Sequence, residues 1–222
     1  MNAPTRIYDL SQPIFSNCPQ YPDKNPRPVQ IRLLYMIGVE GVNKEIVELS
    51  SHTGTHCDAP YHFFDDGPTI DQIPLETYVG PAVIFDLRAK PAGSAIGIAD
   101  LEPWLPRVAP GAIVLLNTGR GERRANTAEF LTHYVYLDGP AAEALVARGV
   151  KGVGIDAVSI GGYDDPAKAG PAHRALLGSG CFITEDLFIP NAVMDERERL
   201  FVAAPVKLQG CGGAWARAML WE

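Results

Sequence analysis

The stretch "ELSSHTGTHCDAPYHFFDDG", residues 49–68, contains three of the five histidines of a 222-residue chain. His52, His56 and His62 surround Asp58 in a segment that also contains glycine and proline. Imidazole nitrogens and carboxylate oxygens together form a ligand set suited to zinc, manganese or iron(II). Because buried histidine and aspartate side chains need partners to offset their desolvation, the cluster indicates a metal site rather than loop residues that bond only to the backbone.

The local geometry of this cluster can be helical or extended. His52 and His56 are four residues apart, as on the helix of zinc proteases, but Gly54 and Pro60 oppose a helix. In an extended segment, positions 52, 54, 56, 58 and 62 project to one side. Gly54 would then leave space between the ligand groups, and Pro60 would bend the segment. We therefore predict an extended segment whose three ligands, with Asp58 among them, leave coordination positions open for catalysis.

Composition limits the classes of partner. The chain has 46% hydrophobic and 20% charged residues, which is typical of a globular protein, and its length suits one domain, predicted to span residues 1–222. The net charge of −7 and the pI near 5.2 oppose binding to nucleic acid. Neither a secretion signal nor an apolar run of membrane-spanning length is evident. The four cysteines form no CxxC motif, so we expect free thiols and a cytoplasmic location.

Short apolar segments bounded by glycine and proline predict an α/β fold with a mixed sheet, in which strands predominate. A helix is predicted over residues 137–149, because Asp138 can cap its start, Pro140 suits its first turn and Gly149 suits its end. A short helix is also expected to begin within residues 98–105. The predicted strands lie within residues 31–37, 44–51, 80–87, 111–119, 150–160, 181–187, 200–208 and 215–221.

The segment "HTGTHCDAPYH", residues 52–62, closely resembles the H-x-G-T-H-x-D-x-P-x-H signature of the metal-dependent cyclase-like hydrolases. That family includes bacterial kynurenine formamidases and isatin hydrolases, and every signature position matches. Other segments resemble family landmarks in the family order: "YDLSQPI", "YPD", "LVARGVKGVGIDAVSI", "AHRALLGSGCFITEDL" and "VKLQG". The resemblance thus covers most of the chain and implies a single compact α/β domain of the swivelling β/β/α type.

The resemblance also implies roles for individual residues. His62 would be the catalytic histidine, and Asp58 would bridge two metals in formamidase-type members. The implied metal ligands are His52, His56, Asp58, His173 and Glu185. Two departures from the family pattern occur in "GCGGAWAR", where Gly212 replaces the usual aspartate and Trp215 the usual proline, and "YPDKNP" lacks a usual glycine. These departures leave the metal motif intact and concern the substrate and the subunit contacts.

We expect a metal-dependent hydrolase that cleaves an amide-type C–N bond of a small molecule, with N-formyl-L-kynurenine as one candidate substrate. One or two divalent ions per subunit, zinc in preference to manganese, would lower the pKa of water towards about 7. His62 would act as general base and then as acid. Isatin-like cyclic amides or lactones are alternative substrates, and a non-catalytic metal-binding protein is an alternative of another class. The resemblance further implies a homodimer or homotetramer.

Other features are interpreted as structural. "GVGIDA", residues 152–157, matches a dinucleotide fingerprint, but its glycines lie inside a strand pattern rather than at a strand-to-helix turn. Cys57 is expected to be a buried packing residue, because its odd position points away from the ligand side. Asp65 and Asp66 are typical turn residues. His133 has no partner signal, so we expect it to be structural or at the pocket rim.

Overall fold

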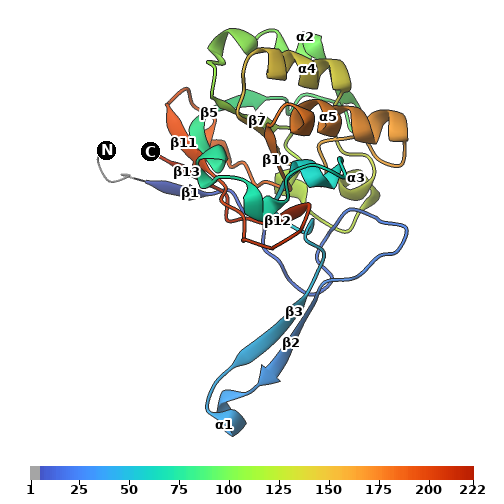
Figure 1. Ribbon diagram of the computed structural model, residues 1–222, viewed down its shortest axis with the longest axis vertical. Coiled ribbons are helices and arrows are strands. Elements are labelled where there is room, and N and C mark those ends of the chain that lie inside the picture. Colours follow the sequence, from blue (N-terminus) through green and yellow to red (C-terminus); the bar gives the residue numbers. More distant parts are fainter. Residues whose placement is uncertain (1–5) are drawn as a thin grey trace.

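The computed structural model describes residues 6–222. Among these residues, nine strands form one mixed sheet in the order β1-β13-β11-β5-β7-β9-β10-β4-β12 (Figure 1). These strands are β1 (Ile7–Asp9), β4 (His56–Asp58), β5 (Val79–Asp86), β7 (Ile113–Asn117), β9 (Gly152–Ile155), β10 (Phe182–Glu185), β11 (Arg199–Val202), β12 (Gly213–Trp215) and β13 (Met219–Trp221).

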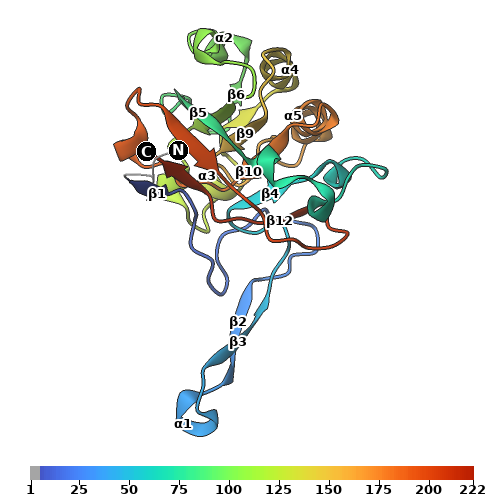
Figure 2. The same ribbon diagram turned by 60° about the vertical axis from the view of Figure 1, so that its left-hand side comes forward.

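The remaining elements are short or lie outside this sheet. Two-stranded sheets pair β2 (Gln30–Tyr35) with β3 (Lys44–Glu48), and β6 (Ala95–Ile96) with β8 (Tyr136–Leu137). The α-helices are α1 (Ile37–Glu40), α2 (Ile98–Leu101), α3 (Ala128–Leu131), α4 (Gly139–Ala147) and α5 (Pro166–Gly178). Helices α2, α4 and α5 lie along one side of the large sheet (Figure 2).

The centre of the sheet is parallel and buried on both faces. Strands β5, β7, β9 and β10 pair in parallel, whereas the flanking strands pair antiparallel. Every residue of β7 is buried, as expected for a central parallel strand. Val114 and Leu116 belong to one core cluster, together with residues of α4 and α5, and Ile113 and Leu115 belong to the other. The predicted α/β class with a mixed sheet is therefore confirmed.

Most of the predicted elements are present. Each predicted strand range overlaps an observed strand, and the short helix α2 begins at Ile98, within its predicted range. The helix predicted over residues 137–149 is α4. Its cap is the Asp138 carboxylate, which accepts a hydrogen bond from the Ala141 amide at 2.8 Å, and Gly149 has a φ of +73° where the chain leaves the helix.

The longest helix, α5, was not predicted. Its start has the expected signals, because the Asp165 carboxylate accepts from the Ala167 amide at 3.0 Å and Pro166 occupies the first turn. The "GP" pair at residues 170–171, however, weakens a helical pattern. Burial of Ala172, Leu176 and Leu177 against the sheet outweighs that local preference.

The histidine segment is only partly extended. Strand β4 covers His56–Asp58, while His52 lies in a turn and His62 ends a 3₁₀ turn that begins at Pro60. Gly54 has a φ of +68°, and a Cβ atom there would lie 2.9 Å from a neighbouring isoleucine side chain. Residue 54 must therefore be glycine because of its backbone conformation and the neighbouring side chain, and not because the ligand groups need space between them. The predicted extended conformation therefore holds for His56 and Asp58 but not for His52, and the chain bends at Pro60 as predicted.

Strands β2 and β3, with α1 at their tip, project from the body as an arm, residues 30–48 (Figures 1 and 2). Neighbouring strand residues such as Ile46 and Val47 point to opposite faces, and both are exposed. The exposed large apolar residues of the arm are Ile31, Leu33, Leu34, Tyr35, Met36, Ile37, Val39, Val42, Ile46 and Val47. Both faces of the arm are therefore apolar.

Two expectations from composition can be compared with the structure. Cys18, Cys57, Cys181 and Cys211 are free thiols, as predicted. Across residues 6–222, each helix is too short or too polar to cross a bilayer. The domain limits of 1–222 stay a prediction, since the structure describes the chain from residue 6.

The "GVGIDA" glycines serve packing. Gly152 and Gly154 lie in the central strand β9, where a Cβ atom on Gly152 would lie 2.2 Å from the Phe182 ring and one on Gly154 would lie 2.7 Å from Leu115 and Leu187. The segment ends at Asp156 and Ala157, buried residues in a bend after β9 and not at the start of a helix, so its interpretation as structural agrees with the fold.

We predict that Gly152→Ala lowers the free energy of unfolding by about 1–3 kcal/mol, because overpacking forces the buried Phe182 ring to move. Chemical denaturation monitored by circular dichroism measures this change. Gly38→Ala is the matched control, since a Cβ atom there meets nothing within 4 Å, and it should change stability by less than about 0.5 kcal/mol. Equal stabilities for the two variants would contradict this packing role.

Candidate metal centre

The site is assembled by strand register around β4. This strand lies between β10 and β12 and pairs antiparallel with both. His56 is opposite Glu185 of β10, and Asp58 is opposite Gly213 of β12. Because His56 and Asp58 are two residues apart in a strand, both point to the same face of the sheet. Three segments distant in sequence therefore meet at one buried point.

The carboxylate of Asp58 is fully buried and lies between imidazole rings. Its Oδ1 atom is 2.9 Å from His52 Nδ1 and 3.3 Å from His56 Nε2, and its Oδ2 atom is 3.8 Å from His173 Nε2. The two carboxylate oxygens thus face different histidines. This arrangement suits a carboxylate shared between two positive centres.

Helix α5 and strand β10 supply the opposite wall. His173 Nε2 lies 3.1 Å from Glu185 Oε1, an atom that also accepts hydrogen bonds from the Ile160 amide at 2.7 Å and the Ser159 hydroxyl at 3.2 Å. The other carboxylate oxygen of Glu185 is 3.5 Å from His56 Nε2. His173 and Glu185, predicted only through the family resemblance, are therefore beside His56 and Asp58.

The hydrogen bonds of the two buried histidines leave lone pairs directed at carboxylates. His56 Nδ1 is 2.8 Å from the Gly54 carbonyl oxygen and His173 Nδ1 is 2.7 Å from the Ala169 carbonyl oxygen. A carbonyl oxygen only accepts, so each Nδ1 carries the proton and a neutral ring presents an unprotonated Nε2. Lone pairs facing negative oxygens require a positive charge between them, either protons or a metal cation.

This donor set fits a divalent metal. Ligand atoms of His52, His56 and Asp58 lie within 4.8 Å of one another, as do those of Asp58, His62 and His173. Within the described residues, His56 Nε2 and Asp58 Oδ2 are buried without a hydrogen-bond partner. Backbone carbonyls that fix the ring orientation of metal-binding histidines are a usual second feature of such sites.

The charges of the protein itself also favour a bound cation at this site. Burial would lower the pKa of His56, but its close contact with the Asp58 carboxylate and the charges of Asp58 and Glu185 raise this pKa to about 9. Burial would likewise lower the pKa of His173, and its contact with Glu185 outweighs this and raises it. Burial raises the pKa of Asp58, yet the surrounding histidines, His62 first, hold it well below its usual range. The site therefore attracts positive charge.

His62 differs from the other histidines. Its ring stacks on His52 with centroids 4.0 Å apart, and the residue keeps contact with solvent through the cavity. Desolvation by surrounding atoms lowers the pKa of His62 to about 4, with Asp58 opposing this and His52 and His173 adding to it. A histidine in contact with solvent is also mostly neutral at pH 7. The imidazole of His62 is therefore neutral whether neighbouring atoms or solvent surround it, and it can accept a proton.

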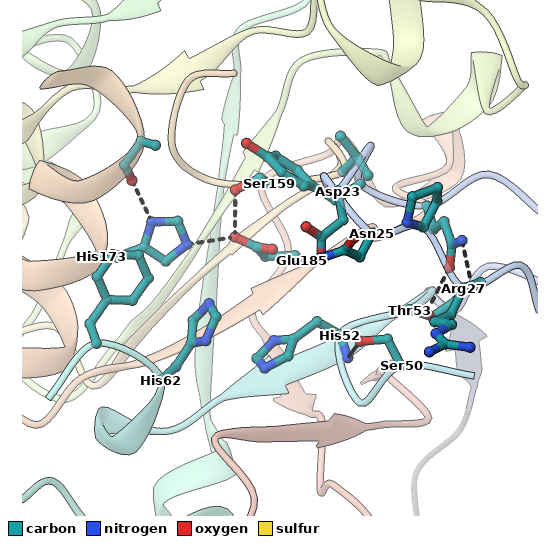
Figure 3. A pocket seen from close by; sticks show the side chains of 16 residues that line it. Asp23, Asn25, Arg27, Ser50, His52, Thr53, His62, Ser159, His173 and Glu185 are labelled. Carbon is teal, nitrogen blue, oxygen red and sulfur yellow. Dashed lines mark hydrogen bonds and ion pairs between the residues drawn. The ribbon is translucent and has the colours of Figure 1, made fainter. Parts of the chain in front are cut away.

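These side chains line a cavity of about 450 Å³, a volume usual for small-molecule sites. Figure 3 shows His62 and His173 toward one end of this cavity, Glu185 near the middle and Arg27 at the other end. Residues that sequence reasoning missed line the remaining wall: Gln20, Tyr21, Asp23, Asn25, Pro26, Arg27, Ser50, Thr53 and Ser159. The segment "YPDKNPRP" contains five of them, and its charges between prolines were the available signal.

The departures from the family pattern lie directly beside the cluster. A Cβ atom on Gly212 would lie 3.0 Å from His62 Cα, and one on Gly213 would lie 2.6 Å from His52 Cε1. The Trp215 indole N–H donates to the Ser50 carbonyl oxygen at 2.7 Å. The "GCGGAWAR" segment therefore packs against the turns that carry His52 and His62.

The residues interpreted as structural lie away from these ligand atoms. Cys57 points to the opposite face, where its thiol contacts the Ala203 carbonyl oxygen at 3.1 Å, and burial raises its pKa to about 12. Asp65 and Asp66 are exposed turn residues. His133 is exposed, bonds to Thr132 and does not line the cavity. These interpretations agree with the structure.

A mixed α/β sheet that gathers paired imidazoles and carboxylates in one cavity defines a metal-dependent hydrolase of the cyclase-like class. The chain belongs to the family described as "Putative cyclase", whose model matches residues 8–161. It is 29% identical to the kynurenine formamidase of Bacillus cytotoxicus and 30% identical to that of Bacillus mycoides. Each match covers 96% of this chain and 95% of the relative.

Solved structures agree with this assignment. Isatin hydrolase A from Ralstonia solanacearum matches with a TM-score of 0.85 and 26% identity, over 97% of this chain and 91% of that one. A predicted metal-dependent hydrolase from Bacillus stearothermophilus matches with a TM-score of 0.79 and 29% identity, over 97% and 98%. Isatin hydrolase A from Labrenzia aggregata, at 24% identity and a TM-score of 0.87 over 97% and 93%, shares the fold. The predicted family and the predicted hydrolase class are confirmed.

We predict that Asp58→Asn loses most of its bound divalent metal, because the amide cannot supply the negative charge that faces three histidines. Metal content after dialysis, measured by elemental analysis, tests this, with circular dichroism to show that the fold persists. Asp65→Asn, an exposed carboxylate outside the cavity, should keep the metal content of the original chain. Full metal content in Asp58→Asn would exclude Asp58 as a ligand.

Proposed function

We propose that the protein hydrolyses the C–N bond of a small amide, with N-formyl-L-kynurenine as the first candidate substrate. The observation that carries this proposal is the buried Asp58 carboxylate, whose two oxygens face different imidazoles at a cavity large enough for a small molecule. Similarity to kynurenine formamidases over nearly the whole chain supports the substrate.

The metal ligands in this proposal are His52, His56, Asp58, His173 and Glu185. Zinc is preferred over manganese because imidazole is the most frequent donor in the set, and the two faces of Asp58 suit one or two ions. A divalent ion held there supplies acidified water and a polarised carbonyl. The chain contributes the fixed ring orientations of His56 and His173 and a cavity wall that excludes bulk water from their ligand atoms.

His62 carries the proton transfers. Its neutral imidazole accepts the proton that water releases as it attacks the formyl carbon. The imidazolium then donates that proton to the leaving nitrogen, so the bond breaks with a neutral amine as product. Asp58 faces His62 across the cluster and opposes the lowering of its pKa, which stabilises the transient positive charge.

A cyclic amide is the second candidate substrate. Isatin hydrolase A from Ralstonia solanacearum, a structure 26% identical to this chain, supports it, and the same water attack would open an isatin-like ring or a lactone. A non-catalytic metal-binding role needs no proton carrier, so the presence of His62 in the cavity favours the enzyme.

We predict that the zinc- or manganese-reconstituted protein converts N-formyl-L-kynurenine to L-kynurenine and formate, and that a chelator removes this activity. The change in ultraviolet absorbance on deformylation measures the rate. Readdition of metal should restore it, which controls for unfolding by the chelator. If the metal-loaded protein turns over isatin or a lactone but not the formamide, the first substrate is wrong and the second stands.

We predict that His62→Ala keeps its metal and loses turnover by about 10²–10⁴-fold, the usual contribution of a general acid–base group. Metal analysis and kcat measured on the same preparation separate the two effects. His133→Ala is the matched control, since this histidine is exposed and lies outside the cavity. A fully active His62→Ala enzyme would exclude the role given to His62.

We further propose a homodimer or homotetramer and a cytoplasmic location. The free cysteines support a reducing compartment. The arm supports self-association, because a two-stranded hairpin is at best marginally stable in water and this one has apolar side chains on both faces.

We predict that Val39→Asp, a change at the exposed tip of the arm, shifts the assembly to smaller species. Sedimentation velocity over a range of concentrations measures this. Leu75→Asp, at a similarly exposed apolar residue on the body, is the control. A chain that is monomeric at every concentration before mutation would contradict the proposed assembly.

A further inference from the structure

The turn that carries His52 joins the metal centre to the arm. Residues 49–55 lead from Glu48, the last residue of β3, to His56 at the start of β4. Every strand residue of β2 and β3 is exposed, so packing of these strands does not hold the turn against the body. Another contact is therefore needed to keep His52 Nδ1 at its distance of 2.9 Å from Asp58 Oδ1.

Trp215 of β12 supplies a contact to this turn. Its indole N–H donates to the Ser50 carbonyl oxygen at 2.7 Å. The same carbonyl oxygen accepts the Thr53 amide, and the Ser50 hydroxyl accepts the His52 amide (Figure 3), each at 3.2 Å. In the described part of the chain, the other backbone hydrogen bonds of residues 50–52 stay inside the turn. The indole therefore joins this part of the turn to the large sheet.

Strand register places Trp215 on the ligand side of the sheet. In the pairing of β12 with β4, Trp215 is opposite His56 and Gly213 is opposite Asp58. Side chains of directly opposed residues project to the same face of a sheet. The Trp215 side chain therefore lies on the face that carries the histidine cluster, where its indole reaches Ser50.

Gly213 gives β12 a second contact, with the His52 ring itself. A Cβ atom on Gly213 would lie 2.6 Å from His52 Cε1 and 3.0 Å from His52 Nδ1, the nitrogen that faces Asp58. Glycine at this position therefore lets the imidazole pack directly against the β12 backbone. The strand thus contacts His52 at its ring through Gly213 and at its turn through Trp215.

His52 needs this support more than the other histidines of the ligand set. The rings of His56 and His173 are oriented by backbone carbonyls that bond to Nδ1. Among residues 6–222, His52 has no such carbonyl partner, since its Nδ1 faces Asp58, and its side chain is 25% exposed. Ligands that are not held in place lower metal affinity, which is why hydrogen bonds around a metal site matter nearly as much as the ligands.

We propose that Trp215 is a positioning residue of the metal centre, which holds the turn so that the His52 imidazole faces Asp58. Trp215 does not line the cavity and acts through His52. This inference rests on the metal ligands named under the proposed function and adds a residue that supports one of them. It also gives a role to a departure from the family pattern, because the proline usual at this position has no side-chain donor.

The test measures zinc affinity in the full chain by competition with a chelating dye, so it needs no turnover. Trp215→Phe keeps an aromatic ring and removes the indole N–H. It should weaken zinc binding about 10- to 100-fold, the usual effect of losing a partner that orients a metal ligand. Gly213→Ala, which crowds the His52 ring, should act in the same direction.

Trp221→Phe is the matched control. The Trp221 indole nitrogen is buried and, over residues 6–222, has no hydrogen-bond partner, and the residue does not line the cavity. Its replacement should leave zinc affinity within about twofold, the scatter expected for a change away from the site. Circular dichroism shows whether each variant keeps the fold. Equal zinc affinity in Trp215→Phe and Trp221→Phe would overturn the proposal.

A double-mutant cycle separates positioning of His52 from a general structural role. If Trp215 acts through His52, adding Trp215→Phe to His52→Ala should change zinc affinity by less than about twofold, although each single change weakens it. The visible absorption spectrum of the cobalt(II)-loaded Trp215→Phe chain should also shift toward that of His52→Ala. Fully additive losses of affinity, or a cobalt spectrum unchanged by Trp215→Phe, would overturn the proposal.

The same cycle distinguishes failure of this inference from failure of the proposed ligand set. Weak zinc binding in His52→Ala together with unchanged binding in Trp215→Phe overturns the role of Trp215 alone. Unchanged zinc binding in His52→Ala removes His52 from the proposed ligands and overturns the role of Trp215 with it.

Discussion

The site depends on one electrostatic constraint: two buried carboxylates face imidazole nitrogens that have already placed their protons elsewhere. His56 and His173 use Nδ1 on backbone carbonyls, so Nε2 of each meets Asp58 or Glu185 with a lone pair. Without added positive charge this arrangement is repulsive. Protons relieve it in the metal-free chain, as the raised pKa values of both histidines indicate, and a divalent ion relieves it in the same place.

The fold holds this repulsive arrangement by covering it from three directions. Strands β10 and β12 pair with both edges of β4, and α5 leads directly toward β10, so His173 and Glu185 arrive together. The parallel centre of the sheet is buried on both faces and supplies the rigidity. Loops then complete the cavity, and one of them contains the "YPDKNP" segment that departs from the family pattern.

Sequence reasoning succeeded where the determining interactions are local. His52, His56 and Asp58 lie within seven positions, and the cap of α4 is encoded by Asp138, so both could be predicted. His173 and Glu185 could be joined to them only through family resemblance, because no spacing rule connects residues separated by more than a hundred positions. Helix α5 was missed because its "GP" pair opposes a helix locally, and tertiary burial of residues such as Leu176 decides the outcome.

The loop of residues 20–27, which lines the cavity, shows the same limit of sequence-based prediction. Asp23 and Arg27 in "YPDKNPRP" have the composition of an ordinary surface turn, and only the contacts of Gln20 with Thr53 place them opposite the histidines. The hydrolase chemistry could therefore be predicted from the contiguous histidine motif. The cavity wall opposite the histidines could not, because it depends on contacts across the whole fold.

The pairing of β4 with two neighbours has an evolutionary consequence. In a strand, alternate residues face opposite sides, so deletion of a single residue here would present Cys57 to the cavity and turn His56 and Asp58 into the apolar core. An insertion or deletion in this strand would therefore remove the metal ligands from the cavity, whereas the loops around the strand tolerate insertion. Divergence among relatives should therefore proceed by exchanging loops around a strand of constant length.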